Sequence, residues 1–227
     1  MSFLKTLLPM CLILLGWTKG FTMENSEIIQ NDKQAFIVKV NTKGFEASIY
    51  SGKPKPSSKT YLAFNVNYSW LGLPIGLVIN KGEVMKSIPL VKASQQGRPL
   101  LGVEFGGIPF ISYSGAATTL FMDYALQAGP TLHDYPSSLA VNDFKTDVAR
   151  VTKHVACGVT KAGKLIVGFF HNSSLMEVSA KLKELGCFKA MNCDGGSKAH
   201  LVYSASEESY SFGIKKAAAG FRFEARQ

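Results

Sequence analysis

A single strong helix signal, set among many short strand-like runs, is the feature that most constrains the fold of this chain. Ser174 and Glu177 have the spacing of a capping box, apolar residues then recur at helical spacing, and Gly186 is a typical helix stop. This pattern predicts a helix over residues 175–185 that leads directly into a strand over 187–193. The other short runs are bounded by turn residues and predict further strands. These strands cover residues 35–40, 45–50, 61–67, 76–79, 100–105, 109–113, 155–159 and 165–170.

Many short strands with one or two helices predict an α+β fold, in the form of a single domain of mixed or antiparallel sheets with few helices. The 227 residues are enough to bury a substantial core. Residues 24–34 are polar and are expected to form a loose lead-in, while residues 131–149 lack periodicity and are expected to form a long loop. We therefore expect one domain over residues 23–227.

The first 22 residues have a different character from the rest of the chain. Lys5 precedes an apolar run from Leu7 to Trp17, which is typical of a secretory signal or a short membrane anchor, although no clear cleavage pattern precedes Phe21. Outside this possible anchor, no run approaches the ~20 apolar residues of a membrane-spanning helix. We expect a secreted or cell-surface protein, or a cytoplasmic one if the segment is not a signal.

Basic residues outnumber acidic residues, with 25 Lys and Arg against 16 Asp and Glu, for a net charge of +9. This balance favours anionic partners, such as a phosphorylated polymer, an acidic surface or a nucleic acid. The basic residues are scattered rather than clustered, so the nucleic-acid signal is weak and a solvated basic surface explains most of the charge.

The cysteines and histidines are dispersed. Four of each occur, and no Cys-x-x-Cys spacing is present, so the sequence predicts no zinc site and no cofactor. Cys11 lies in the N-terminal segment. The other three cysteines are expected to be buried free thiols, with a disulfide between Cys187 and Cys193 as the alternative in an exported protein.

A polar segment follows the predicted strand over 187–193. Asn192 and Asp194 are two residues apart, so on an extended strand both side chains leave the same face. Gly195 and Gly196 then let the backbone turn sharply and approach a ligand closely. This combination is typical of a polar site at the end of a sheet, but Asp-Gly-Gly is also a common hairpin turn.

Over residues 60–205 the chain resembles the phosphodiester glycosidase family in four blocks that stand in the family's order. The blocks are Ala63–Tyr68 with Pro74–Ile79, Leu126–Pro130, Val155–Val159 with Gly163–Leu165, and Ser174–Ser197. The last block is similar to the family's pattern of a helix followed by Asn-x-Asp-Gly-Gly. Two departures stand out, because the family has a third glycine before Ser197 and an arginine at the position of His154.

The resemblance implies a hydrolase that cleaves the bond between a sugar's anomeric carbon and a phosphate. Its substrate would be a sugar-1-phosphodiester, such as an N-acetylglucosamine phosphodiester, within a wall polymer, an exopolysaccharide or another anionic glycan. Asp194 would stabilise the cationic carbon or activate water, with Asn192 and His154 beside it as catalytic residues. The implied substrate-binding residues are Asn65, Asn67, Gln127, Gly195, Gly196, Ser197 and Arg150.

The same reasoning assigns each group a chemical task. Asparagine amides would hold sugar hydroxyls, and the backbone N–H groups of Gly195 and Gly196 would face the phosphate. Arg150, Lys153 or His154 would supply positive charge, and His154 could do so only when protonated, which predicts activity that falls above neutral pH. No dedicated metal site is predicted, but a divalent ion could bridge Asp194 and the phosphate.

Several residues have structural alternatives. Asn65 and Asn67 could cap a turn, and Gln127 could be a satisfied interior amide. Tyr68 and Trp70 are expected to fill the core rather than to stack on a sugar.

Two questions about activity also remain open on the sequence alone. Glu104 or Asp123 could be a second catalytic acid, or merely a paired surface charge. The two departures from the family pattern are the reason to keep a second hypothesis, a glycan-binding or structural module that binds sugar phosphates without turnover.

Overall fold

The computed structural model describes residues 25–54, 59–87, 98–113, 122–134, 150–205, 208–213 and 216–226. The predicted signal or anchor segment lies outside the described residues, and so does the expected loop beyond Asp134. In the described part of the chain, no helix is both long enough and apolar enough to cross a membrane.

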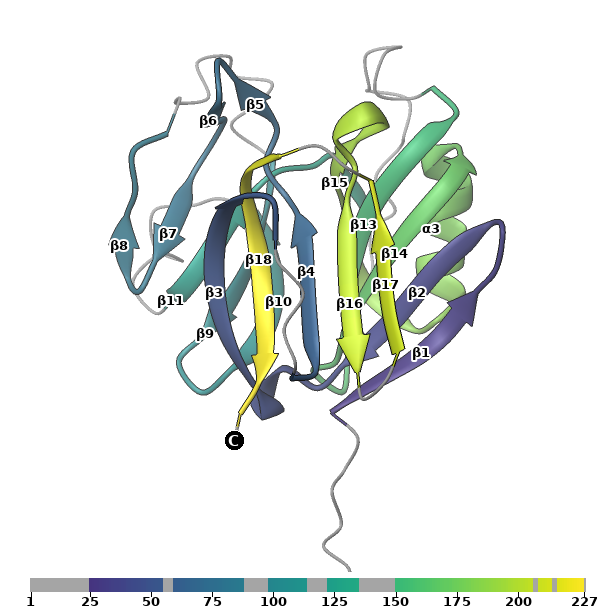
Figure 1. The fold of residues 1–227 in the computed structure, drawn as a ribbon, viewed down its shortest axis with the longest axis horizontal. Helices are drawn as coiled ribbons and strands as arrows, with labels where there is room; N and C mark the ends of the chain where they lie inside the picture. The colour runs from purple at the N-terminus through teal and green to yellow at the C-terminus, as the bar shows by residue number, and fades with distance from the viewer. Residues whose placement is uncertain are drawn as a thin grey trace, which may run out of the picture.

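Antiparallel strands build most of the described chain (Figure 1). The largest sheet has six strands, in the order β1 (Ser26–Asn31), β2 (Ala35–Val40), β14 (Leu165–Ser173), β13 (Thr152–Thr160), β15 (Cys187–Gly195) and β12 (Thr131–Asp134). A second sheet has five strands, in the order β10 (Ile108–Tyr113), β9 (Pro99–Glu104), β11 (Met122–Gln127), β7 (Val78–Asn80) and β8 (Glu83–Val84). A third also has five, in the order β17 (Glu208–Phe212), β16 (Leu201–Ala205), β4 (Tyr61–Asn65), β18 (Ala217–Ala225) and β3 (Phe45–Gly52).

The smaller elements complete the described fold. A two-stranded hairpin is formed by β5 (Ser69–Trp70) and β6 (Leu73–Pro74), and two short 3-10 turns are η1 (Thr42–Gly44) and η4 (Gly196–Lys198). Helix α3 (Leu175–Glu184) begins at the predicted capping box: the Glu177 N–H donates to Ser174 Oγ and the Ser174 N–H donates to Glu177 Oε2. Its apolar residues pack on one face of the six-stranded sheet, as the helical spacing predicted.

The expected fold class is correct in part. The domain is made of antiparallel sheets with a single α-helix among the described residues, so it is dominated by strands rather than being a balanced α+β fold. The polar lead-in predicted for residues 24–34 is wrong, because β1 occupies most of it and pairs along β2. Residues 131–134, expected to lie in a loop, pair with β15 as strand β12. Both are edge strands, which are held by backbone pairing with one neighbour and carry little of the apolar alternation that identifies a strand.

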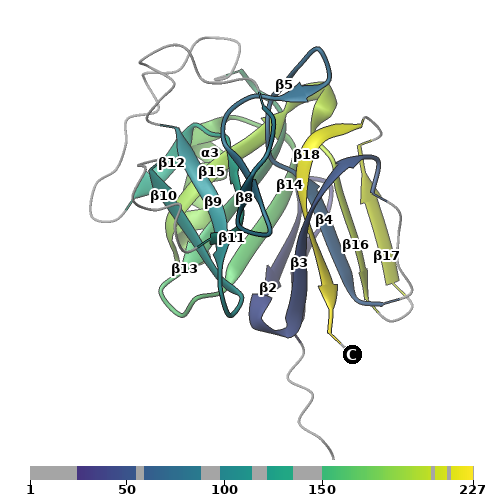
Figure 2. The same cartoon turned by 90° about the vertical axis from the view of Figure 1, so that its left-hand side faces the viewer.

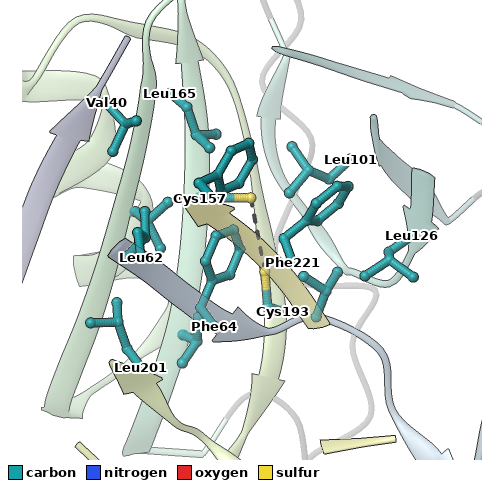
Figure 3. Packing of buried hydrophobic residues seen from close by; sticks show 14 of the residues in the cluster. Val40, Leu62, Phe64, Leu101, Leu126, Cys157, Leu165, Cys193, Leu201 and Phe221 are labelled. Atoms are coloured by element: carbon teal, nitrogen blue, oxygen red, sulfur yellow. Dashed lines mark hydrogen bonds between the residues drawn. The ribbon is translucent and has the colours of Figure 1, made fainter. Parts of the chain in front are cut away.

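The three larger sheets surround one hydrophobic core (Figure 2). Each sheet contributes fully buried side chains to it, among them Phe36 from β2, Leu101 from β9 and Phe64 from β4. Figure 3 shows this interior, where the sulfur atoms of Cys157 on β13 and Cys193 on β15 lie 3.8 Å apart. The core therefore reaches the last residues of β15.

The three described cysteines are buried and free, as expected. Cys193 lies in the core between the sheets, whereas Cys187 packs in the separate cluster beneath α3. The alternative disulfide between these two residues is therefore not supported, because the neighbour of the Cys193 sulfur is Cys157.

Candidate functional site

The end of strand β15 is irregular at the residues that the sequence singled out. His154 on β13 lies opposite Gly195, and Ala156 lies opposite Asn192, so two residues of β15 face one residue of β13 between these pairs. Such a β-bulge redirects side chains and is frequent next to active sites. Here Cys193 stays in the core while the next residue, Asp194, is the last but one of the strand and has only 7% of its surface exposed.

The carboxyl group of Asp194 has an unusual environment. Burial raises its pKa from 3.8 to about 7, which is the largest effect on this group. Three neighbours lower the pKa and limit the shift: the Gly195 N–H, which donates to Asp194 Oδ1 at 2.9 Å, the positive charge of Lys198, and the side chain of Asn65. A carboxyl group that titrates near neutral pH can take up and release a proton under ordinary conditions.

Two amides near Asp194, those of Asn65 and Asn192, are fixed in orientation by their hydrogen bonds. The oxygen of the Asn65 side chain accepts from the His200 N–H at 2.9 Å, which turns its Nδ2 toward Asp194, whose pKa this amide lowers as a hydrogen-bond donor. The Asn192 Nδ2 donates to the Cys193 carbonyl at 2.7 Å and to the Tyr68 hydroxyl at 3.3 Å, and the Asn192 side chain also raises the pKa of His154 through a hydrogen-bonding contact. Asn65 thus positions Asp194, and Asn192 lies between Tyr68 and His154.

His154 adds a buried ring to the same site. It is 2% exposed, and its ring lies beside the Asn192 side chain and the backbones of Arg150 and Ser173, without forming well-aligned hydrogen bonds with them. Burial lowers its pKa more than these neighbours raise it, so the ring is neutral at pH 7 and the expectation that it binds phosphate as a cation is not supported. Buried polar groups normally make well-formed hydrogen bonds, so the poorly aligned contacts that Asn65, Asn192 and His154 make beside Asp194 favour a polar ligand site here.

Positive charge reaches the site from two sides. A Cβ atom on Gly196 would lie 3.2 Å from a guanidinium nitrogen of Arg150, so this exposed side chain lies over the glycine turn. Lys198 follows in η4, and its ammonium group donates to Ser69 Oγ at 2.6 Å. Lys153 is exposed, and the atom that it places against Gly195 is its backbone carbonyl.

Lys198 and Ser69 were missed by the sequence reasoning. The available signal was the position of Lys198 four residues after Asp194, since one 3-10 turn brings a residue at that distance back beside the strand end. Nothing local marks Ser69, because the fold alone brings it to Lys198. Tyr68, one residue earlier, was expected in the core but is only partly buried: its hydroxyl accepts from Asn192 and has a raised pKa through desolvation, and the Arg98 guanidinium lies 5.2 Å from its ring centre.

The glycine turn differs from the expected anion-binding backbone. The Gly195 N–H is used by Asp194 and does not face an empty site. Gly196 has φ +61°, a backbone conformation that favours glycine, and lies beneath Arg150. Ser197 is exposed in the middle of η4.

Two of the predicted binding residues serve other contacts. The Asn67 Nδ2 donates to the carbonyls of Gln127 (2.8 Å) and Ile75 (3.2 Å). The side chain of Gln127 accepts from the Leu77 N–H at 3.0 Å and donates to the Arg98 carbonyl at 3.2 Å. These bonds tie β7 and β11 to the loops beside them and give both amides a structural role, so their part in substrate binding stays a prediction.

The other candidates are not brought to the site. Glu104 ends β9 and Asp123 lies on β11, both in the second sheet, and neither contributes to the electrostatic environment of Asp194. Trp70 was expected in the core but is 65% exposed, so that expectation is wrong. Among the described residues, no three His, Cys, Asp or Glu side chains lie together in a way that could hold a metal ion.

Residues 34–223 match the phosphodiester glycosidase family, so the chain belongs to that family. A search of curated proteins gave no match. Solved structures share the fold: the catalytic domain of zebrafish N-acetylglucosamine-1-phosphodiester alpha-N-acetylglucosaminidase, auto-inhibited by its pro-peptide, is 15% identical with a TM-score of 0.66, over 89% of this chain and 83% of that chain.

Two further structures are similar. A hypothetical protein from Synechocystis is 12% identical with a TM-score of 0.59, over 88% of this chain and 61% of that one. A putative exported protein from Burkholderia pseudomallei is 10% identical with a TM-score of 0.54, over 85% of this chain and 74% of that one.

Proposed function

We propose that this chain is a hydrolase that cleaves the bond between a sugar's anomeric carbon and the oxygen of a phosphodiester. The observation that carries the proposal is the buried carboxyl group of Asp194, whose pKa is about 7 and which ends a cluster of buried polar side chains with Asn65, Asn192 and His154. A sugar ring presents hydroxyl groups that both donate and accept, which suits the amide groups and the neutral imidazole in this cluster.

The chemistry needs a base and a means to stabilise the leaving group. A phosphate monoester leaves readily, so cations can assist its departure in place of a strong acid. Arg150 and Lys198 flank Asp194 and are the groups we assign to the phosphate. His154, neutral at pH 7, would hydrogen-bond with the substrate rather than supply charge.

In the proposed step, the bond between the anomeric carbon and the phosphate oxygen breaks and its electrons leave with the phosphate. A water oxygen forms the new bond to the anomeric carbon, and the ionised Asp194 carboxylate takes the proton that this water loses. The products are a free sugar and a phosphate monoester, and Asp194 then releases its proton to solvent. Activity therefore requires the ionised form of Asp194 and rises with pH through about 7.

The substrate class follows from the family and its relatives. The zebrafish enzyme is named for an N-acetylglucosamine-1-phosphodiester, so diesters of this sugar are the first to test. A wall polymer or exopolysaccharide remains our proposed natural source, and export is proposed from the N-terminal segment and from the similarity to a putative exported protein.

The test is release of free sugar from a panel of sugar-1-phosphodiesters by the wild-type chain and by Asp194→Asn, which keeps the shape of the side chain but not its charge. Asp123→Asn is the matched control, since it makes the same change outside the site. We expect turnover by the wild type and the control, and a loss of at least a hundredfold in kcat for Asp194→Asn. Equal turnover by all three would refute the proposal.

The alternative, a module that binds glycan phosphates without turnover, predicts tight binding of the same diesters by both the wild type and Asp194→Asn, with no sugar released by either. Chelation of divalent ions during the assay tests the possible bridging ion. A loss of activity that added magnesium or calcium restores would support such an ion.

A further inference from the structure

The tip of the β5–β6 hairpin carries apolar side chains that the fold leaves in solvent. Trp70 is 65% exposed, Leu71 88% and Leu73 40%. Isolated apolar residues at a surface are common, but three on one short hairpin make a patch that water hydrates poorly. Such a patch indicates contact with another molecule.

The backbone of this tip is held in an unfavourable conformation for its sequence. Leu71 has φ +50° and Gly72 has φ +81°, which is the pattern of a two-residue hairpin turn with both central residues in the left-handed region. Glycine adopts that conformation freely, whereas leucine does not, and asparagine would suit the first position better. Because Leu71 is also the most exposed of the three, neither backbone preference nor burial accounts for a leucine there.

The hairpin is attached directly to the candidate site. Ser69, the residue before Trp70, accepts a hydrogen bond from Lys198, and Tyr68 accepts one from Asn192. Two residues of extended chain span at most about 7 Å, so the backbone of Trp70 lies within that distance of Tyr68. Figures 1 and 2 place the hairpin at the same end of the molecule as the short turn that follows β15.

We propose that Trp70 and Leu71 form a second carbohydrate subsite, which binds a neighbouring unit of a sugar-phosphate polymer whose glycosidic bond lies at Asp194. This rests on the proposed function. The face of an indole ring packs against the C–H groups of a pyranose and leaves the sugar hydroxyls in water, so a partly exposed tryptophan suits such a ligand. A polymer of this kind is also a polyanion, which matches Lys198 and Arg150 beside the site and the net charge of +9.

The test uses the fluorescence of Trp70 itself. The chain has only two tryptophans, so a Trp17→Phe change leaves Trp70 as the single reporter. Asp194→Asn is added to prevent turnover. A soluble oligomer of sugar 1-phosphate units is titrated against this protein, with the monomeric methyl diester of the same sugar phosphate and vesicles of phosphatidylglycerol as the other two probes. We expect the oligomer to shift the emission, and the vesicles to leave it unchanged.

Calorimetry with the same oligomer then measures the contribution of the side chain. Trp70→Ala should weaken oligomer binding about tenfold, which is about 1.4 kcal/mol, with little change for the monomer. Trp70→Phe should retain most of the affinity, since it keeps an aromatic face. Phe105→Ala is the matched control, because Phe105 is 62% exposed in the β9–β10 turn at the opposite end of the molecule.

Oligomer affinity unchanged by Trp70→Ala would overturn the proposal, and so would an emission shift with vesicles but not with the oligomer. Since binding is measured without turnover, the two proposals fail separately. Oligomer binding that depends on Trp70 in a protein that cleaves no diester would support the subsite and refute the hydrolase. Turnover of small diesters, together with an oligomer affinity that Trp70→Ala does not change, would support the hydrolase and refute the subsite.

Discussion

Replacing Asp194 with asparagine should stabilise the folded protein at neutral and alkaline pH, even though it removes the proposed catalytic base. Burial raises the pKa of this carboxyl group from 3.8 to about 7, and the residue is only 7% exposed. The difference of about 3 pH units, at 1.36 kcal/mol for each unit, corresponds to about 4 kcal/mol. This figure is the cost of ionising the buried group relative to ionising it in the unfolded chain.

The sign of the effect follows from where the proton is held. Below about pH 4 the carboxyl group is protonated in both states, so its contribution to stability is fully present. Between about pH 4 and about pH 7 the folded state keeps a proton that the unfolded chain has lost, so the free energy of unfolding falls as the pH rises. Above about pH 7 both states are ionised and the loss is complete.

Urea unfolding of the wild type and of Asp194→Asn over a series of pH values measures this difference. The variant's free energy of unfolding, minus that of the wild type, should rise by about 4 kcal/mol from pH 4 to pH 8. Glu177→Gln is a control of opposite sign, because hydrogen bonds from Ser174 lower the pKa of Glu177. The contribution of Glu177 to stability is therefore present above the pKa of the unfolded chain and is lost as the pH falls. A difference between wild type and Asp194→Asn that does not change with pH would refute the reasoning.

Three further outcomes are expected. Lys198→Met removes a charge that lowers the pKa of Asp194, so the acid limb of the kcat/KM profile should move to higher pH, whereas Lys198→Arg should leave it in place. Gly196→Ala should lower the free energy of unfolding by about 1 kcal/mol because φ is +61°, and it should also lower activity because the new methyl group meets Arg150. Gly163→Ala is the control: Gly163 has φ +70° and open space around it, so this change should lower stability alone. Since burial lowers the pKa of His154, kcat/KM should rise to a plateau as Asp194 ionises and should not fall between pH 7 and pH 8.5, and a fall over that range would support a cationic role for His154.

The parts of the fold that the sequence predicts well are those determined by local signals. The capping box and the apolar spacing define α3, and long apolar runs define β2, β13 and β14, because burial on both faces requires nearly continuous apolar residues. Strands at sheet edges, such as β1 and β12, are stabilised by pairing with one neighbour. Nothing in their own composition distinguishes them from loops, so they were missed.

The candidate site divides in the same way. Asn192 and Asp194 were found because they are close in sequence and followed by glycines. The pairing of Asn65 with the His200 backbone, and of Lys198 with Ser69, joins residues from β4, the β5–β6 hairpin and η4, and only the assembled sheets bring these together. Whether a tryptophan lies inside or outside likewise depends on what packs over it, which is why the exposure of Trp70 was not predicted.

The proposed bond cleavage is tested most directly by hydrolysing a sugar-1-phosphodiester in ¹⁸O-labelled water and measuring the mass of each product. Attack of water at the anomeric carbon places the label in the released sugar, with unlabelled phosphate monoester, and this reaction should disappear in Asp194→Asn. Label in the phosphate would show that the phosphorus–oxygen bond breaks instead. That result would contradict the assignment of Asp194 as the base for glycosidic cleavage.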